Sequence, residues 1–373
     1  MSIKAQTYLE LLKICLQDEP KVTDKLINLS NGHIDWIDLL DFAARQGVIG
    51  VYWRGIELIF KSPTPLNKPT DDEVMEWWGE VNDIRKRNED LFKKTAFVSD
   101  TFRKEGFDNC ILKGQGNAMM YPNPYLRTSG DIDIWLKGTP SDISTYINQF
   151  FPDQKFGKLH IEFPILKNPL VEVHYTPRIF DNPFANKYLQ SFFRDNRDYQ
   201  MNHYINLPNN TKITTPTPEF NIIYQLTHIM QHIIYGGITL KQIIDYYYVL
   251  KEYKKRKDNN QHTIKESEMI NTLKRTGMIR FSKIIMYIMH NGLGLKDEYL
   301  YTSQDKKGGA VILSSIIEED DNNYKHPHNM MNLSKYNTVR ERQKLKTIRA
   351  IQLLPYFPGE TIWGLFGRIK DAI

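Results

Sequence analysis

Cysteine is scarce in this chain of 373 residues, which contains only Cys15 and Cys110. Two thiols so far apart in the sequence indicate neither a disulfide framework nor a thiolate metal site. The chain also lacks any run of about eighteen apolar residues, and Lys4, Glu10 and Lys13 interrupt the apolar positions of its first segment. We therefore expect a soluble protein of the reducing cytoplasm, without membrane insertion.

A strong charge of either sign is also missing, because the net charge is only +5 and the basic residues are dispersed. This argues against nucleic acid as a partner, although a nucleic-acid-binding adaptor stays a rival hypothesis. Hydrophobic residues make up 41% and charged residues 25% of the chain, which excludes a disordered or collagen-like protein. The length predicts about two domains, or one domain with large elaborations.

The first part of the chain shows helical periodicity. Apolar residues recur at spacings of three and four over 5–15, 34–60 and 71–105. Three prolines between 61 and 70 separate the last two segments, and Thr70 followed by three acidic residues is a typical helix start. We predict a helical N-terminal region over 1–106.

The periodicity then changes to the alternation of strands. Strands are expected at 109–112, 130–136, 159–166 and 170–175, and a helix is expected at 142–150. The last two strands are joined by a hairpin signal at Lys167, Asn168 and Pro169. A small mixed α/β core is therefore predicted over 107–215.

Helical spacing returns from residue 217 onward and predicts a helical C-terminal region over 216–373. A helix at about 240–253 is followed by a basic, amide-rich tract at 254–260, interpreted as an exposed connection or, alternatively, a phosphate-binding patch. No periodic pattern assigns 301–336. The predicted fold class is α+β, with a small mixed sheet, flanking helices and helical regions on both sides.

Two aspartates stand at strand spacing in Gly130-Asp131-Ile132-Asp133-Ile134. Residues two apart in a strand point the same way, so Asp131 and Asp133 are expected on one face. Such a pair suits two magnesium ions, the arrangement that clamps an in-line phosphoryl displacement. The alternative is an exposed edge strand whose acidic face meets water.

A third carboxylate occurs in the alternating run Val171-Glu172-Val173-His174, where Glu172 and His174 share a face. If this strand lies beside the first, Glu172 can complete a metal site with Asp131 and Asp133. His174 is then a candidate for contacting a nucleotide or assisting proton transfer, and His160 is a weaker candidate. Upstream, the amides of Gly114, Gln115 and Gly116 and the charge of Lys113 form a candidate phosphate cradle.

Three further side chains are less specific. Arg127 can reach a triphosphate or form a structural salt bridge. His228 and His232 lie four apart on an expected helix and so share a face. They are interpreted as packing residues or as contacts to the nucleotide, because the further ligands of a zinc protease are missing from the sequence.

The motifs Leu112-Lys113-Gly114, Tyr121-Pro122-Asn123-Pro124, Arg127 and Gly130-Asp131-Ile132-Asp133-Ile134 resemble the uncharacterised nucleotidyltransferase family of the DNA polymerase beta-like superfamily. The resemblance covers about 30–250. It implies a glycine-rich turn at Gly114, metal-binding acids at Asp131, Asp133 and Glu172, and a strand of the acidic-x-His type.

The family resemblance implies an enzyme that moves a nucleoside monophosphate from a nucleoside triphosphate (NTP) to an acceptor, with two Mg²⁺ ions. The sequence leaves the acceptor open among a small molecule, a sugar, a protein and an RNA end. The rival hypothesis is a catalytically inactive nucleotide-binding or regulatory module that keeps the fold.

Overall fold

The computed structural model describes residues 1–372 except 62, 64, 153, 155, 236, 319–346 and 348–349. The described chain divides into two compact units. The first contains 1–82, 226–251 and 277–373, and the second contains 83–225 and 252–276. The predicted boundaries after residues 106 and 215 stay a prediction.

The first unit is helical, as the periodicity predicts. Its helices, including those that continue into the second unit, are α1 (Ile3–Leu16), α2 (Asp24–Ser30), α3 (Trp36–Gln46), α4 (Ile49–Lys61), α5 (Asp71–Lys104), α9 (Pro218–Tyr235), α10 (Leu240–Asp258), α12 (Ile279–Tyr287), η2 (Ile288–Gly292), η3 (Asp297–Tyr299), α13 (Lys306–Glu318) and α15 (Pro358–Ala372). α5 begins where the sequence predicts, because Thr70 and Glu73 form a capping box: Thr70 N donates to Glu73 Oε2 at 2.7 Å, and Glu73 N to Thr70 Oγ1 at 3.3 Å.

The second unit is built around a mixed sheet. Its strands are β1 (Asn109–Leu112), β2 (Ile132–Leu136), β3 (His160–Glu162) and β4 (Val171–His174), in the order β1-β2-β4-β3. β2 and β4 run parallel, whereas β1 is antiparallel to β2 and β3 is antiparallel to β4. The remaining elements are α6 (Gly114–Ala118), η1 (Pro124–Leu126), α7 (Pro140–Phe150), α8 (Pro183–Met201), α11 (Glu266–Arg275) and the hairpin of β5 (Tyr204–Asn206) with β6 (Lys212–Thr214).

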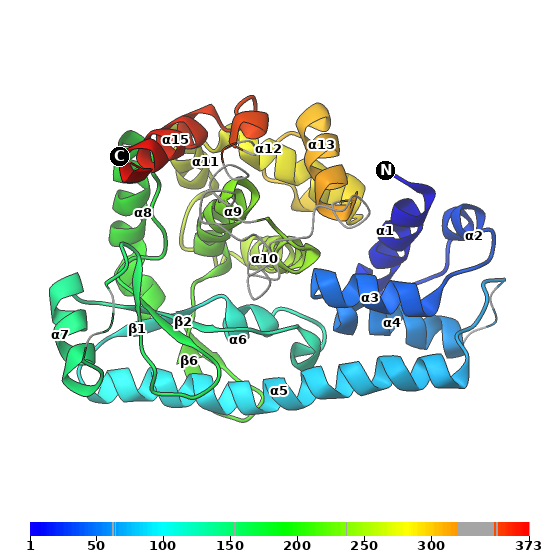
Figure 1. The fold of residues 1–373 in the computed structure, drawn as a ribbon, viewed down its shortest axis with the longest axis horizontal. Helices are drawn as coiled ribbons and strands as arrows, with labels where there is room; N and C mark the ends of the chain where they lie inside the picture. Colours follow the sequence, from blue (N-terminus) through cyan, green and yellow to red (C-terminus); the bar gives the residue numbers. More distant parts are fainter. Residues whose placement is uncertain are drawn as a thin grey trace. The chain divides into compact units, whose positions relative to one another are not determined.

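The two faces of the four-stranded sheet differ in character. One face carries Ile132, Ile134 and Val173, which join a core cluster with α5 and α7. Figure 1 shows β1 and β2 beside the C-terminal part of α5 (cyan), which supplies Phe92 and Phe102 to this cluster. Because alternate residues of a strand face opposite ways, the other face carries Asp133, Trp135, Glu172 and His174.

Part of this second face is covered by aromatic rings. Trp135 stacks on Phe220 with ring centroids 5.9 Å apart, and Phe220 stacks on Phe192 of α8 at 5.4 Å. The predicted α+β class with a small mixed sheet and flanking helices is confirmed. The sheet therefore has one side that is mainly apolar, with the buried Asn109 hydrogen-bonded to Ser99 of α5, and the polar side chains of β2 and β4 share the other side with an aromatic stack.

Several predicted boundaries were wrong. β2 begins at Ile132 rather than at 130, and the two hairpin strands are shorter than the alternating runs that predicted them. Of 301–336, the structure describes α13 and the residues before it, and the rest of that stretch lies outside the described residues.

The interpretation of 254–260 as an exposed connection was right about exposure, since 255 and 257–260 are exposed, but wrong about where the helix ends. α10 continues to Asp258, because Lys254 Nζ pairs with Asp258 at 2.6 Å one turn further on. Arg256 lies 3.4 Å from Glu219, and Lys257 lies 2.5 Å from Glu266. These cations already have carboxylate partners, and they also suit the negative end of a helix.

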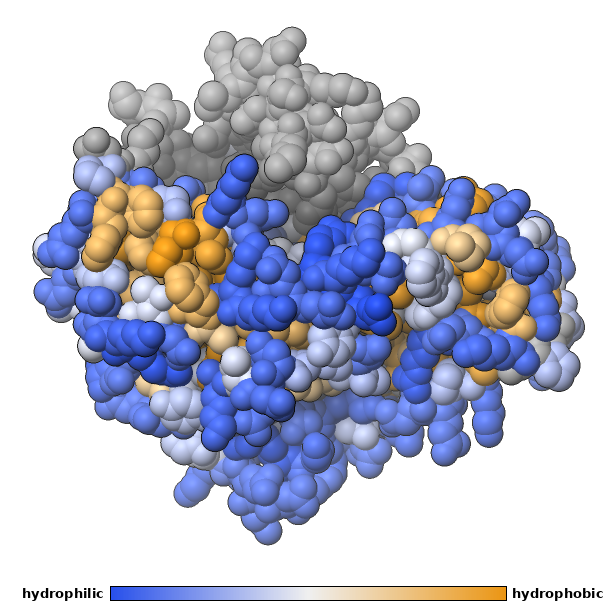
Figure 2. Space-filling view, turned by 90° about the horizontal axis from the view of Figure 1, so that it is seen from below, coloured by the Kyte–Doolittle hydropathy of each residue, from blue (hydrophilic) through white to orange (hydrophobic). Residues whose placement is uncertain are grey.

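Most of the surface seen from below is hydrophilic, with separate hydrophobic patches between the charged side chains (Figure 2). Exposed apolar side chains of the first unit include Phe60, Met75 and Trp78. Among the described residues, we find no helix with both the length and the apolar character needed to cross a bilayer.

Candidate functional site

Asp133 lies in the middle of the polar side of the sheet. The parallel pairing of β2 with β4 makes Asp133 and Glu172 direct register partners. Asp133 is 9% exposed, and its oxygens contact Lys113 Nζ at 3.1 Å and His174 Nε2 at 3.0 Å. Burial opposes the charge of Asp133, but Lys113 and the hydrogen bond with His174 outweigh it and hold the pKa of this carboxyl well below its usual value.

Glu172 and His174 are brought together as the alternation predicts. His174 is 2% exposed, and its Nε2 lies 3.5 Å from Glu172 Oε2 as well as near Asp133. Burial again opposes the charge of Glu172, while the hydrogen bond with His174 leaves the pKa of Glu172 below its usual value. Two ionised carboxylates thus converge on one imidazole nitrogen.

Asp131 precedes β2, and its side chain is exposed. The turn after β1 lies against the same stretch of backbone, because a Cβ added to Gly114 would be 3.9 Å from the carbonyl oxygen of Asp131. Lys113 has a φ of 59° and Gly114 a φ of 47°. A positive φ strains lysine but not glycine, and such strain persists where surrounding contacts hold it, here the pairing of Lys113 with Asp133.

Gln115 and Arg127 belong to a buried hydrogen-bonded network. Gln115 Nε2 donates to Asn88 Oδ1 at 3.3 Å, and Ser129 Oγ donates to Gln115 Oε1 at 3.1 Å. Arg127 is 4% exposed and donates to Ser129 Oγ at 3.4 Å, while Asn88 Nδ2 donates to the Arg127 carbonyl at 2.8 Å. The network fixes the segment that leads into Asp131, a role that sequence spacing did not indicate.

Gly116 permits a close approach between α6 and the segment that follows β6. A Cβ at this position would lie 2.2 Å from Thr215 Oγ1, which donates to the Ile111 carbonyl of β1 at 3.2 Å. We expect Gly116→Ala to lower the free energy of unfolding by about 1–3 kcal/mol, measured by chemical denaturation, because the methyl group must force this packing apart.

Gly130→Ala is the matched control, since a Cβ there meets nothing within 4 Å, and we expect a change within about 0.5 kcal/mol. Adding Thr215→Ala to Gly116→Ala should restore part of the loss. Equal stability of the two single variants would contradict this account of Gly116.

His228 and His232 contact each other on α9, with ring centroids 4.3 Å apart. His232 Nδ1 also lies 3.2 Å from the Gly237 carbonyl. Both histidines belong to the first unit, whereas the carboxylates belong to the second. Their predicted contact with a nucleotide stays a prediction.

The structure adds His160 of β3 to the polar face. His160 is the register partner of His174, and its Nδ1 lies 3.7 Å from Glu172 Oε2. His160, Glu172 and His174 each offer a ligand atom, and these atoms all lie within 4.8 Å of one another. The alternation of 159–166 placed His160 on a strand, but the pairing partner depends on the register of the hairpin.

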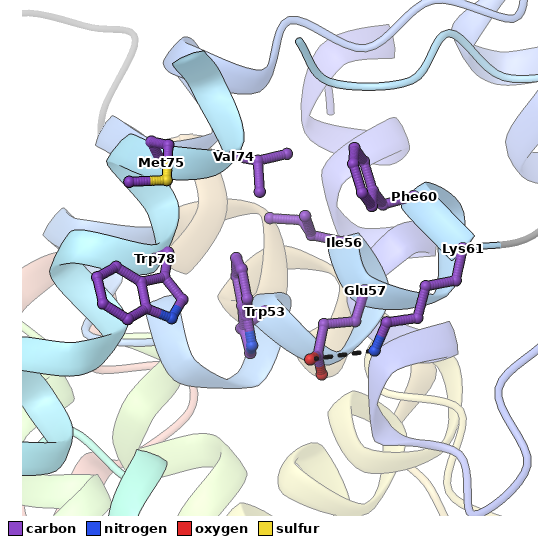
Figure 3. A pocket seen from close by; sticks show the side chains of 8 residues that line it. All are labelled: Trp53, Ile56, Glu57, Phe60, Lys61, Val74, Met75 and Trp78. Carbon is purple, nitrogen blue, oxygen red and sulfur yellow. Dashed lines mark ion pairs between the residues drawn. The ribbon is translucent and has the colours of Figure 1, made fainter. Parts of the chain in front are cut away.

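The first unit contains an apolar groove of about 300 Å³ between α4 and the start of α5. Figure 3 shows its lining side chains, which include Trp53 and Phe60 of α4 and Trp78 of α5, and an ion pair between Glu57 and Lys61. Phosphate recognition needs several convergent polar groups, and this groove is lined mainly by carbon. We therefore place the candidate site on the sheet of the second unit.

The comparison with protein families agrees with the resemblance seen in the motifs. No curated protein matches the chain. A solved structure, an antigenic nucleotidyltransferase-like protein from Paracoccidioides brasiliensis, is similar with 14% identity and a TM-score of 0.36 over 59% of this chain and 96% of that chain. A family model described as uncharacterised nucleotidyltransferase matches residues 32–280, which include every candidate site residue named above. Since this match spans well over half of the sequence, the chain belongs to the uncharacterised nucleotidyltransferase family.

Proposed function

We propose that this protein transfers a nucleoside monophosphate from an NTP to an acceptor hydroxyl or phosphate. The observation that carries the proposal is the register of β2 with β4, which sets the ionised side chains of Asp133 and Glu172 on one face of the sheet. Asp131 immediately precedes β2 and so lies two residues before Asp133. An acidic set of this kind is what a family of nucleotidyltransferases needs to hold divalent ions.

The donor set fits Mg²⁺, because carboxylate oxygens are hard ligands and both strand-borne carboxyls are kept ionised. Asp131, Asp133 and Glu172 would hold two ions, which supply charge neutralisation at the transferring phosphoryl group. Lys113 Nζ lies 3.1 Å from Asp133, so its positive charge would be available to a phosphate bound beside this carboxylate.

In the proposed step, an acceptor oxygen forms a bond to the α-phosphorus of the NTP, and the bond from that phosphorus to the bridging oxygen breaks. Pyrophosphate leaves with the electron pair, and the acceptor proton passes to Glu172 or to solvent. Gly114, Gln115, Gly116 and Arg127 would position the phosphates, either directly or by holding the turn. His174 would orient both carboxylates, and His228 and His232 are further candidates for nucleotide contact.

A second candidate is a nucleotide-binding or regulatory module without turnover. It is favoured by the contacts of Asp133, because Lys113 and His174 already engage its carboxylate at 3.1 Å and 3.0 Å. If neither group yields to a metal ion, a nucleotide can bind on this surface without being activated for transfer.

Equilibrium binding of labelled NTPs in the presence of Mg²⁺ tests the proposal, with the variant Asp131→Ala/Asp133→Ala as comparison. We expect the double variant to lose binding, since the ions that neutralise the triphosphate lose two ligands. Equal binding by both proteins would contradict the proposal. Binding without pyrophosphate release, across alcohol, sugar, protein and RNA acceptors, would favour the module.

A further inference from the structure

Two imidazoles and a carboxylate meet at the β3–β4 side of the sheet. Directly opposed residues of an antiparallel pair project from the same face, so His160 and His174 lie together. Glu172, two residues before His174, shares that face. Glu172 Oε2 lies 3.7 Å from His160 Nδ1 and 3.5 Å from His174 Nε2.

The polar atoms of this cluster are incompletely satisfied within the described part of the chain. His160 Nδ1, which lies 3.7 Å from Glu172 Oε2, is buried and has no hydrogen-bond partner there. Glu162 stands directly opposite Glu172 in the β3–β4 ladder, and like charges in that relation destabilise a pair of strands. A cation coordinated by an imidazole nitrogen and a carboxylate oxygen would satisfy the nitrogen and reduce the repulsion between the two glutamates.

We propose that His160, Glu172 and His174 bind a divalent transition-metal ion of the Zn²⁺ class. Nitrogen and oxygen ligands about 2.1 Å from a tetrahedral ion are about 3.4 Å from each other. The two distances to Glu172 Oε2, 3.5 Å and 3.7 Å, are near that separation. Imidazole nitrogen selects Zn²⁺, Co²⁺ or similar ions, whereas Mg²⁺ prefers oxygen ligands alone.

The exposure of the ligands also suits such an ion. Around the cluster, the carboxylates Asp133 and Glu172 face the cations Lys113, which pairs with Asp133, and Arg178, which acts electrostatically on His160. The side chains of His160 and Glu172 are 33% and 24% exposed, which leaves a path for the ion and room for a fourth ligand from solvent. Three protein ligands and one open position are typical of reactive zinc sites rather than of closed structural ones.

This ion would change the environment of Asp133. His174 Nε2 shares a hydrogen bond with Asp133 at 3.0 Å, and the same nitrogen faces Glu172. One nitrogen lone pair serves either a proton or a metal ion, so binding at Nε2 ends the hydrogen bond with Asp133. The site therefore goes beyond the proposed transfer reaction, although the two share Glu172.

Titration of the metal-free full chain with Co²⁺ tests the site without any nucleotide. We expect one equivalent to bind and to give the visible absorption of tetrahedral Co²⁺, and we expect Zn²⁺ but not excess Mg²⁺ to displace it. His160→Ala removes a ligand and should weaken Co²⁺ binding by about 100-fold or more, since even indirect partners of a ligand contribute about 10–100-fold. His160→Cys supplies another zinc-class ligand and should keep the binding.

His33→Ala is the matched control, because His33 is exposed and lies in the other unit. Circular dichroism of each variant establishes that it is folded. Absence of visible absorption in the wild type, or equal Co²⁺ affinity of the wild type and His160→Ala, would overturn the proposal. If the protein binds Co²⁺ in this way but does not bind NTP with Mg²⁺, the proposal of a transition-metal site stands and the proposal of nucleotidyl transfer is contradicted.

Discussion

Asp133→Asn will reduce pyrophosphate release from an NTP in the presence of Mg²⁺ by about 1,000-fold or more. Asparagine keeps the shape of the side chain but removes the negative charge that Lys113 and His174 hold in place. Preorganised charge at a phosphoryl-transfer site is worth roughly this factor, and a metal ligand contributes at least as much. Steady-state pyrophosphate release with a saturating acceptor is the measurement.

Asp108→Asn is the control for this first prediction. Asp108 is a solvent-exposed aspartate of the same unit that pairs with Lys137 at 3.6 Å, and such surface pairs contribute little. We expect wild-type rates from this variant. Comparable rates of pyrophosphate release from Asp133→Asn and Asp108→Asn would contradict the assignment of Asp133 as a metal-binding residue.

A loss of folding must be separated from a loss of chemistry. Asp133→Asn leaves the Lys113 ammonium, whose side chain is only 17% exposed, without its carboxylate. Thermal unfolding of Asp133→Asn gives the temperature range in which this variant is folded, and we expect pyrophosphate release to stay about 1,000-fold lower within that range. Wild-type release by the folded variant would mean that Asp133 acts only through stability.

Glu219→Ala will lower the free energy of unfolding of the second unit by about 3–5 kcal/mol. Glu219 is fully buried, and its Oε1 accepts hydrogen bonds from Thr263 N at 2.7 Å and Thr263 Oγ1 at 2.9 Å. Its Oε2 lies 3.4 Å from Arg256 Nε, in an ion pair without a hydrogen bond. Removing one partner of a buried pair leaves the other charge uncompensated, which costs about this much.

Hydrogen exchange of peptides from β2 and α8 under increasing urea measures this loss within the second unit. Glu89→Ala is the control, because Glu89 is exposed on α5 and lies 3.8 Å from Arg85. We expect its effect to stay within about 0.5 kcal/mol. If the two variants opened at the same urea concentration, the ion pair of Glu219 would have no structural importance.

The sequence alone determined the strands that carry the candidate site and much of that site, whereas α8, β5 and β6 were not predicted. The alternation in 131–134 was sufficient to predict that Asp133 faces away from its apolar neighbours, because a strand has a fixed period of two. The alternation in 171–174 likewise predicted that Glu172 and His174 share a face. The family resemblance carried by the same residues is confirmed. Helical periodicity and the Thr70 start likewise predicted α5 to within one residue of its observed end.

Tertiary structure decided which of these residues meet. The parallel register that sets Asp133 beside Glu172 joins strands separated by a long connection, and the antiparallel register that adds His160 depends on how the β3–β4 hairpin is closed. No local period encodes either pairing. The same holds for the Gln115 side chain and the Arg127 carbonyl, which both hydrogen-bond to Asn88 of α5. Local periodicity fixes which way a side chain points, whereas the register between strands fixes what it points at.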